Sequence, residues 1–240
     1  MTEMLFYQRV IPLDSNAHRN LRIKPESGFG FAAKTNSVPL VSVEFAEAAK
    51  EYPIIFVKGS DDAFMPVALT GLRENENLFV DAAGKWQANY VPAFVRRYPF
   101  VTSVAAEKQL MVCVDEVADC LKRPDGMALF VNGKPSPYLA QALALLQEYQ
   151  NHIPATQELS NRLAQFGLLM QTNIEAKMAT GGNFGLVGGY IVDEKRLRAL
   201  NKVKALQLFN SGLLALIYAH LISLGNFQKL LDRLAMREAG

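Results

Sequence analysis

Residues 52–80 decide the fold class, and they read YPIIFVKGSDDAFMPVALTGLRENENLFV. Three short runs within this stretch, 52–57, 65–72 and 77–80, are rich in β-branched and aromatic residues, and the polar segments GSDD and RENE separate them. Apolar runs of this length between polar turn residues are typical of antiparallel strands. We therefore predict a sheet from this part of the chain.

Predicted strands continue beyond this stretch, whereas the N-terminal segment is irregular. DAAGKW is typical of a turn and leads to Trp86, and residues 109–114 and 127–131 have the composition of further strands. Residues 4–50 hold three prolines and the glycine pair of SGFGFAA, which favour turns and extended segments over long helices. We therefore expect residues 40–132 to be the β-rich part of the chain.

Helical spacing begins after Pro135. Apolar residues recur three and four positions apart over 138–150, and the next segment offers Thr156 as an N-cap and Gly167 as a C-terminal stop. These signals predict two helices. Further along, LVGGYIVDEKRL predicts a strand that runs into a helix capped by Asp193.

The C-terminal part of the chain is predicted to be helical to its end. Residues 204–224 and 227–235 form the last two predicted helices, which are separated at Gly225 and Asn226. Before them, the glycine-rich segment TGGNFGLVGGY, residues 180–190, is interpreted as a loop or hairpin turn, since no helix follows it at the position where a phosphate-binding loop needs one.

The sequence predicts a single domain of the α+β class over residues 1–240. No segment has the composition of a flexible linker. An antiparallel-rich central sheet from residues 40–132 would be covered by helices that come mainly from the helix-rich residues 135–240. A chain of 240 residues that is 50% hydrophobic and 20% charged can bury a substantial core, which argues against a disordered protein.

Charge and cysteine content argue against nucleic acids, metals and cofactors. The chain has 25 basic and 23 acidic residues, and a net charge of +2 gives no strong field to attract a nucleic-acid backbone. Cys113 and Cys120 lie farther apart than the cysteine pairs of structural zinc sites, whose spacing is about two to four residues. We expect two reduced thiols, no metal or cofactor, and no nucleic-acid partner.

The sequence predicts neither an export signal nor a membrane span. The N-terminus reads MTEMLFYQRVIPLD, with Glu3 early and Arg9 interrupting the apolar run. Residues 205–224 are the most apolar long stretch, but they contain polar side chains that are costly in hydrocarbon: Gln207, Asn210, Ser211, His220 and Ser223. We expect a buried helix there and a cytoplasmic protein; the sequence gives no sign of an oligomeric state.

Six segments resemble one family when taken in order. They are HRNLR at His18, YPIIF at Tyr52, GLRENENLFVDAAGKW at Gly71, YVPAFVRRYPF at Tyr90, GGYIVDEKRL at Gly188 and LLALIYAHLISL at Leu213. Together they resemble the SapC family over roughly residues 5–232. The resemblance implies a bacterial protein of a family named after a surface-layer locus. Members tend to be linked by gene context with flavin-dependent halogenase-like proteins and outer-membrane receptors, and the resemblance implies no catalytic mechanism.

No catalytic motif stands out in the sequence. There is no GxSxG, no HExxH, no phosphate-binding GxxxxGK[ST] and no GxGxxG after a strand. The histidines are the natural bases to test, first His220 and His18. On a helical projection His220 lies in the apolar sector of Leu213 and Ile217, which fits either a hydrogen-bonded core histidine or a buried site histidine.

The segment YVPAFVRRYPF is the better candidate for recognition. Pro92 can start a helical turn and Pro99 must end it, so Arg96 and Arg97 project about 100° apart. Arginine binds carboxylate or phosphate in a bidentate manner, and aromatic rings pack against organic ligands. The predicted binding residues are Trp86, Tyr90, Arg96, Arg97 and Tyr98.

A structural role for the same arginines stays open. Either one could pair with a carboxylate of Asp81, Glu44 or Asp115 and tie the turn to the sheet. We expect residues 86–100 to line the main concave surface, with at least one of the two arginines exposed to it.

Two functional hypotheses follow from these observations. The first is a non-catalytic accessory or binding protein for a peptide or protein of a surface-layer, secretion or peptide-modification pathway. The second is an enzyme of unfamiliar design that modifies a peptide or small molecule. A deep pocket that holds a histidine and a carboxylate within hydrogen-bond reach would favour the enzyme, and a flat, exposed, aromatic-rich patch would favour the binding protein.

Overall fold

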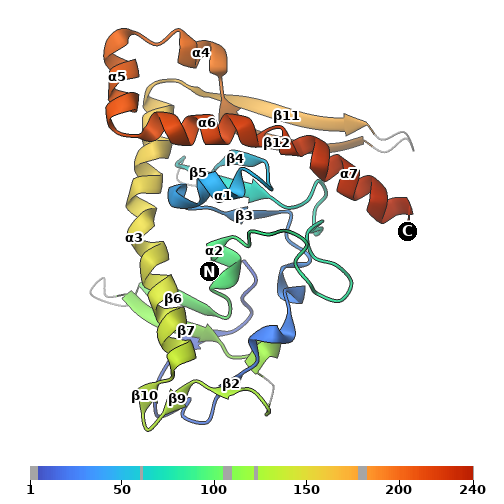
Figure 1. Cartoon of the computed structure of the whole chain (residues 1–240), viewed down its shortest axis with the longest axis vertical. Helices are drawn as coiled ribbons and strands as arrows, with labels where there is room; N and C mark the ends of the chain where they lie inside the picture. The colour runs from blue at the N-terminus through green and yellow to red at the C-terminus, as the bar shows by residue number, and fades with distance from the viewer. Residues whose placement is uncertain (1–4, 60–61, 105–109, 122–123, 178–182, 240) are drawn as a thin grey trace.

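A computed structural model of the chain describes residues 5–59, 62–104, 110–121, 124–177 and 183–239 (Figure 1). Its larger sheet has five strands, and each neighbouring pair is antiparallel. In order across the sheet, the strands are β11 (Leu169–Lys177), β12 (Asn183–Val192), β4 (Ile54–Lys58), β5 (Phe64–Leu69) and β3 (Ser37–Pro39). The sheet therefore joins the strands predicted from residues 52–72 to a hairpin from the C-terminal half of the chain.

A second, smaller sheet lies at the other end of the molecule (Figure 1). It has the order β1 (Val10–Pro12), β7 (Leu110–Asp115) and β6 (Phe100–Val104), again antiparallel. Two short pairs extend this end. They are β2 (Arg22–Ile23) with β8 (Met127–Ala128), and β9 (Phe130–Val131) with β10 (Lys134–Pro135).

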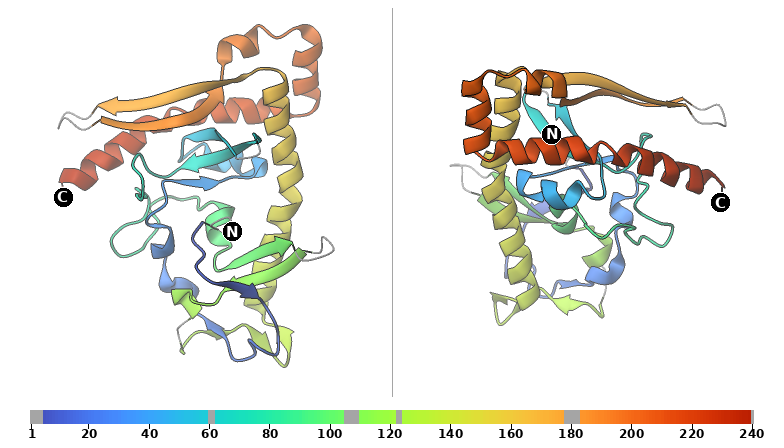
Figure 2. Two further views of the ribbon diagram at one scale, coloured as in Figure 1. Left: turned by 180° about the vertical axis from the view of Figure 1, so that it is seen from behind. Right: turned by 45° about the horizontal axis from the view of Figure 1, so that its top comes forward.

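One long helix, α3 (Pro137–Gln165), runs beside both sheets and contacts β5 and β6 (Figures 1 and 2). It begins where Ser136 caps it, because the Ser136 side chain accepts a hydrogen bond from the Leu139 amide, and Pro137 suits the first helical position. The helix buries Leu139 and Leu146 in its N-terminal part and Leu159 farther along. It thus holds the two halves of the molecule together.

The remaining helices are short or lie at the C-terminal end. They are α1 (Phe45–Ala48), α2 (Ala93–Arg96), α4 (Glu194–Arg198), α5 (Lys202–Asn210), α6 (Leu213–Ser223) and α7 (Asn226–Ala239). α6 packs against α1, β4 and β12, whereas α4 and α5 project at one end of the molecule (Figures 1 and 2). Asp193 caps α4 by accepting hydrogen bonds from the amides of Lys195 and Arg196, as its position in the sequence predicts.

Among the described residues, one stretch has the length and composition of a membrane span. It runs from Leu213 to Ala239 through α6 and α7, and 33% of its most apolar stretch of 18 residues is buried inside the molecule. Core helices of soluble proteins can have the same length and apolar composition. In this chain α6 buries Leu213 and Ile217, together with the polar side chains of His220 and Ser223.

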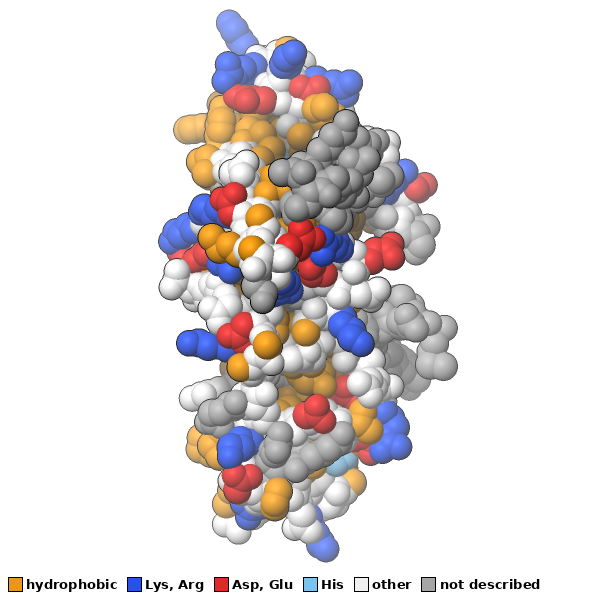
Figure 3. All heavy atoms as spheres, turned by 90° about the vertical axis from the view of Figure 1, so that its right-hand side faces the viewer, with side chains coloured by type: hydrophobic (Ala, Val, Ile, Leu, Met, Phe, Trp, Pro, Cys, Tyr) orange, Lys and Arg blue, Asp and Glu red, His pale blue; other side chains and the backbone are white. Residues whose placement is uncertain are grey.

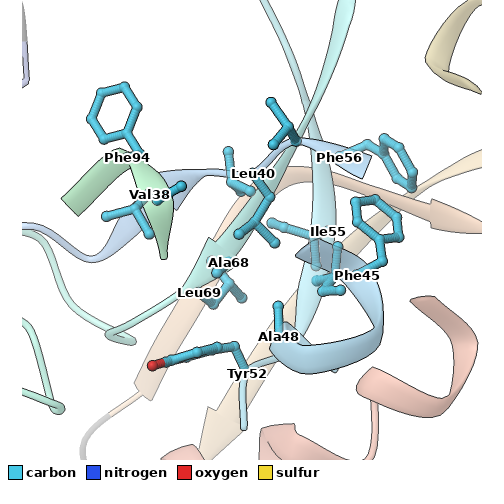
Figure 4. Close-up of a cluster of buried hydrophobic side chains, with 14 of the residues drawn as sticks. Val38, Leu40, Phe45, Ala48, Tyr52, Ile55, Phe56, Ala68, Leu69 and Phe94 are labelled. Carbon is cyan, nitrogen blue, oxygen red and sulfur yellow. The ribbon is translucent and has the colours of Figure 1, made fainter. Parts of the chain in front are cut away.

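The main core lies between the five-stranded sheet, α1 and α3. Phe45 and Ala48 of α1 meet Ile55 and Phe56 of β4, and Tyr52 leads into that strand (Figure 4). All five are completely buried. A second cluster lies under the small sheet, where Phe100 and Val114 pack with Leu139 and Leu146 of α3. The α+β class expected from the sequence is confirmed.

Two boundary predictions in the central and helical parts are wrong. Residues 77–80 form no strand and make only an isolated bridge between Val80 and Trp86, because the Asn77 side chain bonds to the Phe79 amide and holds a turn. The two helices predicted between 138 and 167 are one helix, α3, with Pro154 inside it. Thr156 does not cap a helix end. Its Oγ1 donates to the carbonyl oxygen of His152 and accepts from the Ser42 amide.

The last predicted helices also divide differently. The structure breaks 204–224 at Gly212, whose φ of +74° suits glycine far better than other residues, so α5 and α6 are separate. Within the glycine-rich segment, residues 183–190 belong to strand β12, and 178–182 lie outside the described residues. The helix-rich half therefore also supplies β11 and β12.

Candidate functional site

A cleft of about 410 Å³ lies between the N-terminal segment, the loop around Gly28 and the end of α2. Many of its lining side chains are aromatic. We call it the aromatic cleft, and it is lined by Phe6, Gln8, Ile23, Pro25, Ser27, Gly28, Phe29, Gly30, Phe31, Val95, Arg96, Tyr98, Val117, Asp119, Cys120 and Tyr138. Of the residues that the sequence singles out for binding, Arg96 and Tyr98 lie here.

Phe31 and Tyr98 form the centre of the aromatic wall. Their rings are stacked, with centroids 4.0 Å apart and an interplanar angle of 21°. Phe6 meets Phe31 edge-on at 5.3 Å, and Phe29 lies 6.2 Å from it. Flat, half-buried rings of this kind offer apolar area to a ligand at a low cost in conformational entropy.

The loop that carries Phe29 and Phe31 depends on glycine. Gly28 has φ +86° and ψ −169°, a conformation that is almost restricted to glycine, and a Cβ atom there would lie 2.9 Å from the Gly84 carbonyl oxygen. The Phe29 amide donates to that same oxygen at 2.7 Å. The DAAGKW turn thus supports the loop from behind, which gives this motif a role in shaping the cleft.

Arg96 and Arg97 point in different directions, as their adjacency at the C-terminal end of the short helix α2 dictates. Arg96 is exposed, and its Nε donates to the Val91 carbonyl oxygen at 2.9 Å. Arg97 is half-buried, with its guanidinium carbon 3.9 Å from the ring centre of Phe94 and 5.0 Å from that of Tyr149. Arg96 therefore lines the cleft and stays exposed, while the side chain of Arg97 packs against the protein.

The ion pairs considered for these arginines do not form. Within the described part of the chain, no salt bridge joins Arg96 or Arg97 to Asp81, Glu44 or Asp115. Arg97 instead interacts with the hydroxyl of Tyr7. Burial raises the pKa of Tyr7 to about 12, although the charge of Arg97 opposes that rise.

Two buried carboxylates hold the two ends of the segment that carries the arginines. Glu44 Oε1 accepts hydrogen bonds from the Tyr90 hydroxyl and the Ala93 amide, each at 2.7 Å. Asp115, which is fully buried, accepts from the Tyr98 hydroxyl at 3.2 Å. Burial, reinforced by the neighbouring carboxylate, raises the pKa of both tyrosines, so both hydroxyls stay protonated.

Tyr90 and Trp86 lie outside the aromatic cleft. Tyr90 lines a smaller hollow of about 260 Å³ together with Arg96, Glu148 and His152, so Arg96 lies between the two hollows. Trp86 is only 6% exposed, and its Nε1 donates to the Tyr52 hydroxyl at 2.8 Å.

Trp86 supports the cleft from behind. Its indole meets the ring of Phe29 edge-on at 5.6 Å and stacks on Phe79. Trp86 is therefore a core residue behind the cleft wall and does not itself line the cleft.

The side chains that line the aromatic cleft are poorly suited to nucleophilic catalysis. Burial, with the nearby carboxylates of Asp119 and Asp115, raises the pKa of the Cys120 thiol to about 11, so the thiol is protonated at neutral pH. The lining residues include no histidine. In the described part of the chain, no group of three His, Cys, Asp or Glu side chains could hold a metal ion.

His220 joins two strands of the large sheet. β12 pairs with β4 at Tyr190 and Phe56, and the same register continued along both strands would bring Val192 opposite Ile54. The imidazole lies between these two residues instead, with Nδ1 2.9 Å from the Ile54 carbonyl oxygen and Nε2 accepting from the Val192 amide at 3.0 Å. Of its two interpretations, the hydrogen-bonded core histidine fits this arrangement.

The neutral state of His220 follows from the same contacts. Burial lowers its pKa to about 4, against the smaller effect of its bond to Ile54. His18 is in a different setting: its Nδ1 lies 3.0 Å from the Asp14 amide in a surface turn after β1. That turn belongs to the end of the molecule opposite α6, so the structure does not bring the two histidines together (Figure 1).

Phe6, Phe29, Phe31 and Tyr138 are cleft residues that sequence reasoning missed. The alternation of glycine and phenylalanine in SGFGFAA is the one signal that could have indicated a shaped aromatic loop. Phe6 and Tyr138 carry no local signal, because the fold alone brings the chain start and the first turn of α3 to the loop.

Comparisons with known proteins give one match. The model of the SapC family matches residues 13–230. No curated protein and no solved structure matches the chain.

Proposed function

The chain belongs to the SapC family, and from this premise and the aromatic cleft we propose that it is an accessory protein that binds a peptide segment. The bound segment would carry an aromatic or apolar side chain close to a carboxylate. The pathway would be one of surface-layer assembly, secretion or peptide modification.

The observation that carries the proposal is that exposed Arg96 lines the same cleft as the stacked Phe31 and Tyr98 rings. An apolar side chain can cover the rings, while a guanidinium binds a carboxylate with two parallel hydrogen bonds. Arg96 already uses its Nε on Val91 and also interacts with the Tyr90 hydroxyl, which orients its outer nitrogens. A preoriented cation next to an aromatic surface favours recognition of this pair of groups.

The cleft supports binding better than catalysis. Its Tyr98 and Cys120 are both held protonated, and the histidine with the strongest sequence signal, His220, is fully buried within the sheet. A general base near neutral pKa, which most acid–base enzymes need, is missing among the described lining residues.

The chain offers its own probe for the test. Trp86 is its single tryptophan, and it touches Phe29 of the cleft wall, so ligand binding should change its fluorescence. A library of short peptides with Phe, Tyr or Leu beside Asp, Glu or a free C-terminus would be titrated against the full chain. Matched peptides with Asn, Gln or an amidated C-terminus would serve as controls.

The expected result is saturable binding that needs both the apolar side chain and the carboxylate. Arg96→Ala should weaken it, whereas Arg19→Ala, at an exposed arginine in the surface turn of His18, should not. Binding that is indifferent to both peptide groups, or equal in the two variants, would contradict the proposal. Turnover of a bound peptide would favour the enzyme hypothesis instead.

A further inference from the structure

Helix α5 turns an apolar face away from the protein. Val203, Leu206 and Phe209 are 67%, 58% and 69% exposed, whereas Leu208 is buried. At about 100° per residue these three side chains fall within an arc of roughly 120°, on the side opposite Leu208. Helices on the surface of a protein ordinarily bury such a face, so this one lacks a partner among the residues that the structure describes.

The same end of the molecule is rich in cations. Between positions 193 and 210 the chain has five Lys or Arg residues and two acidic residues. The two acids are already paired, Asp193 with Arg196 at 3.2 Å and Glu194 with Arg198 at 2.5 Å. The remaining cations are Lys195, Lys202 and Lys204, and the ammonium of Lys204 lies over the ring of Phe166, 5.0 Å from its centre. Blue Lys and Arg side chains gather at this end in Figure 3, above hydrophobic ones.

We infer that α4 and α5 form a docking element for the surface of a membrane that contains anionic lipids. In this arrangement α5 lies in the plane of the interface. Val203, Leu206 and Phe209 enter the boundary between headgroups and acyl chains, and Lys195 and Lys202 face lipid phosphates. An amphipathic helix with an aromatic and aliphatic face and flanking cations is suited to this environment.

Geometry and charge favour a membrane over other occupants. α4 and α5 project from the rest of the fold, so a flat surface can reach the apolar face (Figures 1 and 2). A second copy of the chain would place the excess cations of one protomer near those of the other, which is unfavourable. With only three apolar side chains to insert, docking should be weak, reversible and dependent on anionic lipid.

The test is co-sedimentation of the full chain with vesicles. One set is pure phosphatidylcholine and the other is an equal mixture of phosphatidylcholine and phosphatidylglycerol. The wild-type chain should bind the anionic set, and added salt should weaken binding. A triple variant, Val203→Ser, Leu206→Ser and Phe209→Ser, should bind more than about tenfold less well.

Two controls separate this result from general effects. Val43→Ser, Val131→Ser and Met236→Ser remove three comparably exposed apolar side chains elsewhere and should leave binding unchanged. The lysine variant Lys195→Gln and Lys202→Gln should lose most of the salt dependence. Circular dichroism and melting curves would establish that each variant is folded.

Three outcomes would overturn the inference. The first is that the folded wild-type chain does not bind anionic vesicles, and the second is that the α5 variant binds them as well as the control variant does. The third is self-association without lipid that the α5 variant abolishes, measured by analytical ultracentrifugation. That result would assign the apolar face of α5 to a second copy of the chain.

Discussion

The hydroxyl of Tyr98 donates a hydrogen bond to the fully buried carboxylate of Asp115 at 3.2 Å. The matching bond from Tyr90 to Glu44 holds the other end of the same segment. Two buried acceptors therefore fix the short helix between these tyrosines, and with it the direction of Arg96. Hydrogen bonds of this kind hold a binding side chain in a defined position, since exposed arginine side chains are otherwise flexible.

The first prediction concerns Glu44, whose carboxylate accepts from Val41 on one oxygen and from Tyr90 and Ala93 on the other. Glu44→Gln replaces one acceptor oxygen by an NH₂ group that must face a backbone N–H or the hydroxyl. We expect a loss of unfolding free energy of about 1 to 3 kcal/mol, measured by urea denaturation. Glu47→Gln, at an exposed acid paired with Lys50, should change stability by less than about 1 kcal/mol. Equal stabilities would contradict this role of Glu44.

The second prediction separates the two arginines. Arg96→Ala should leave the melting temperature unchanged and weaken peptide binding by about 1.5 to 3 kcal/mol, the range for hydrogen bonds to charged groups. Arg97→Ala should lower the melting temperature and leave peptide binding unchanged, because it removes a cation that lies over Phe94 and Tyr149 and interacts with Tyr7. A stability loss of about 0.5 to 2 kcal/mol is expected. Calorimetry and peptide titration on both variants check this, and a reversed pattern would assign recognition to Arg97.

The sequence predicted the parts of the fold that local patterns encode. The β-branched runs that became β4 and β5, the helical spacing of α3 and the cap at Asp193 are all local signals. Thr156, taken as an N-cap, misled the helix assignment, because burial along both halves of α3 keeps the helix continuous despite Pro154. The break between α5 and α6 depends on the left-handed backbone conformation of Gly212, which the composition alone does not reveal.

The candidate site could be predicted only in part. Arg96 and Tyr98 lie in a motif with two prolines, so their place beside a short turn followed from the sequence. Most of the other lining residues come from residues 6–31, an irregular segment without periodicity whose position depends on contacts with the DAAGKW turn. Trp86 looked like a ligand contact because of its type, but its bond to Tyr52 places it in the core.

The third prediction is a pH dependence that comes from His220. Its pKa is lowered from the usual 6.5 to about 4, so the unfolded chain binds a proton more readily than the folded one. The contribution of His220 to stability is complete above pH 6.5 and decreases as the pH falls toward 4. Over this window about 3 kcal/mol should be lost.

His220→Gln provides the control for this pH dependence. A glutamine can offer an NH₂ group to the Ile54 carbonyl oxygen and its own oxygen to the Val192 amide, in place of the two ring nitrogens, but it does not titrate. Urea unfolding at pH 7.5 and pH 4.5 should show a smaller difference in this variant than in the wild type. An equal difference in both proteins would mean that other groups cause the acid sensitivity.

The last prediction uses two glycines of the same loop. Gly28→Ala introduces a Cβ atom 2.9 Å from the Gly84 carbonyl oxygen at a backbone conformation that is almost restricted to glycine. The strain, about 1 to 3 kcal/mol, can be relieved only if the loop with Phe29 and Phe31 moves away from the DAAGKW turn. Peptide affinity should then fall by about tenfold or more, and the fluorescence of Trp86 should change because Phe29 leaves its ring.

Gly30→Ala is the matched variant, since no atom lies within 4 Å of the added Cβ and Gly30 begins a 3-10 helix. It should bind peptide like the wild type and be equally stable, or more stable by about 0.4 to 1 kcal/mol because its unfolded chain is less flexible. Fluorescence spectra, melting curves and peptide titrations of both variants check the pair. If Gly28→Ala melts lower but binds with wild-type affinity, the loop is scaffold, and the ligand must contact other parts of the cleft.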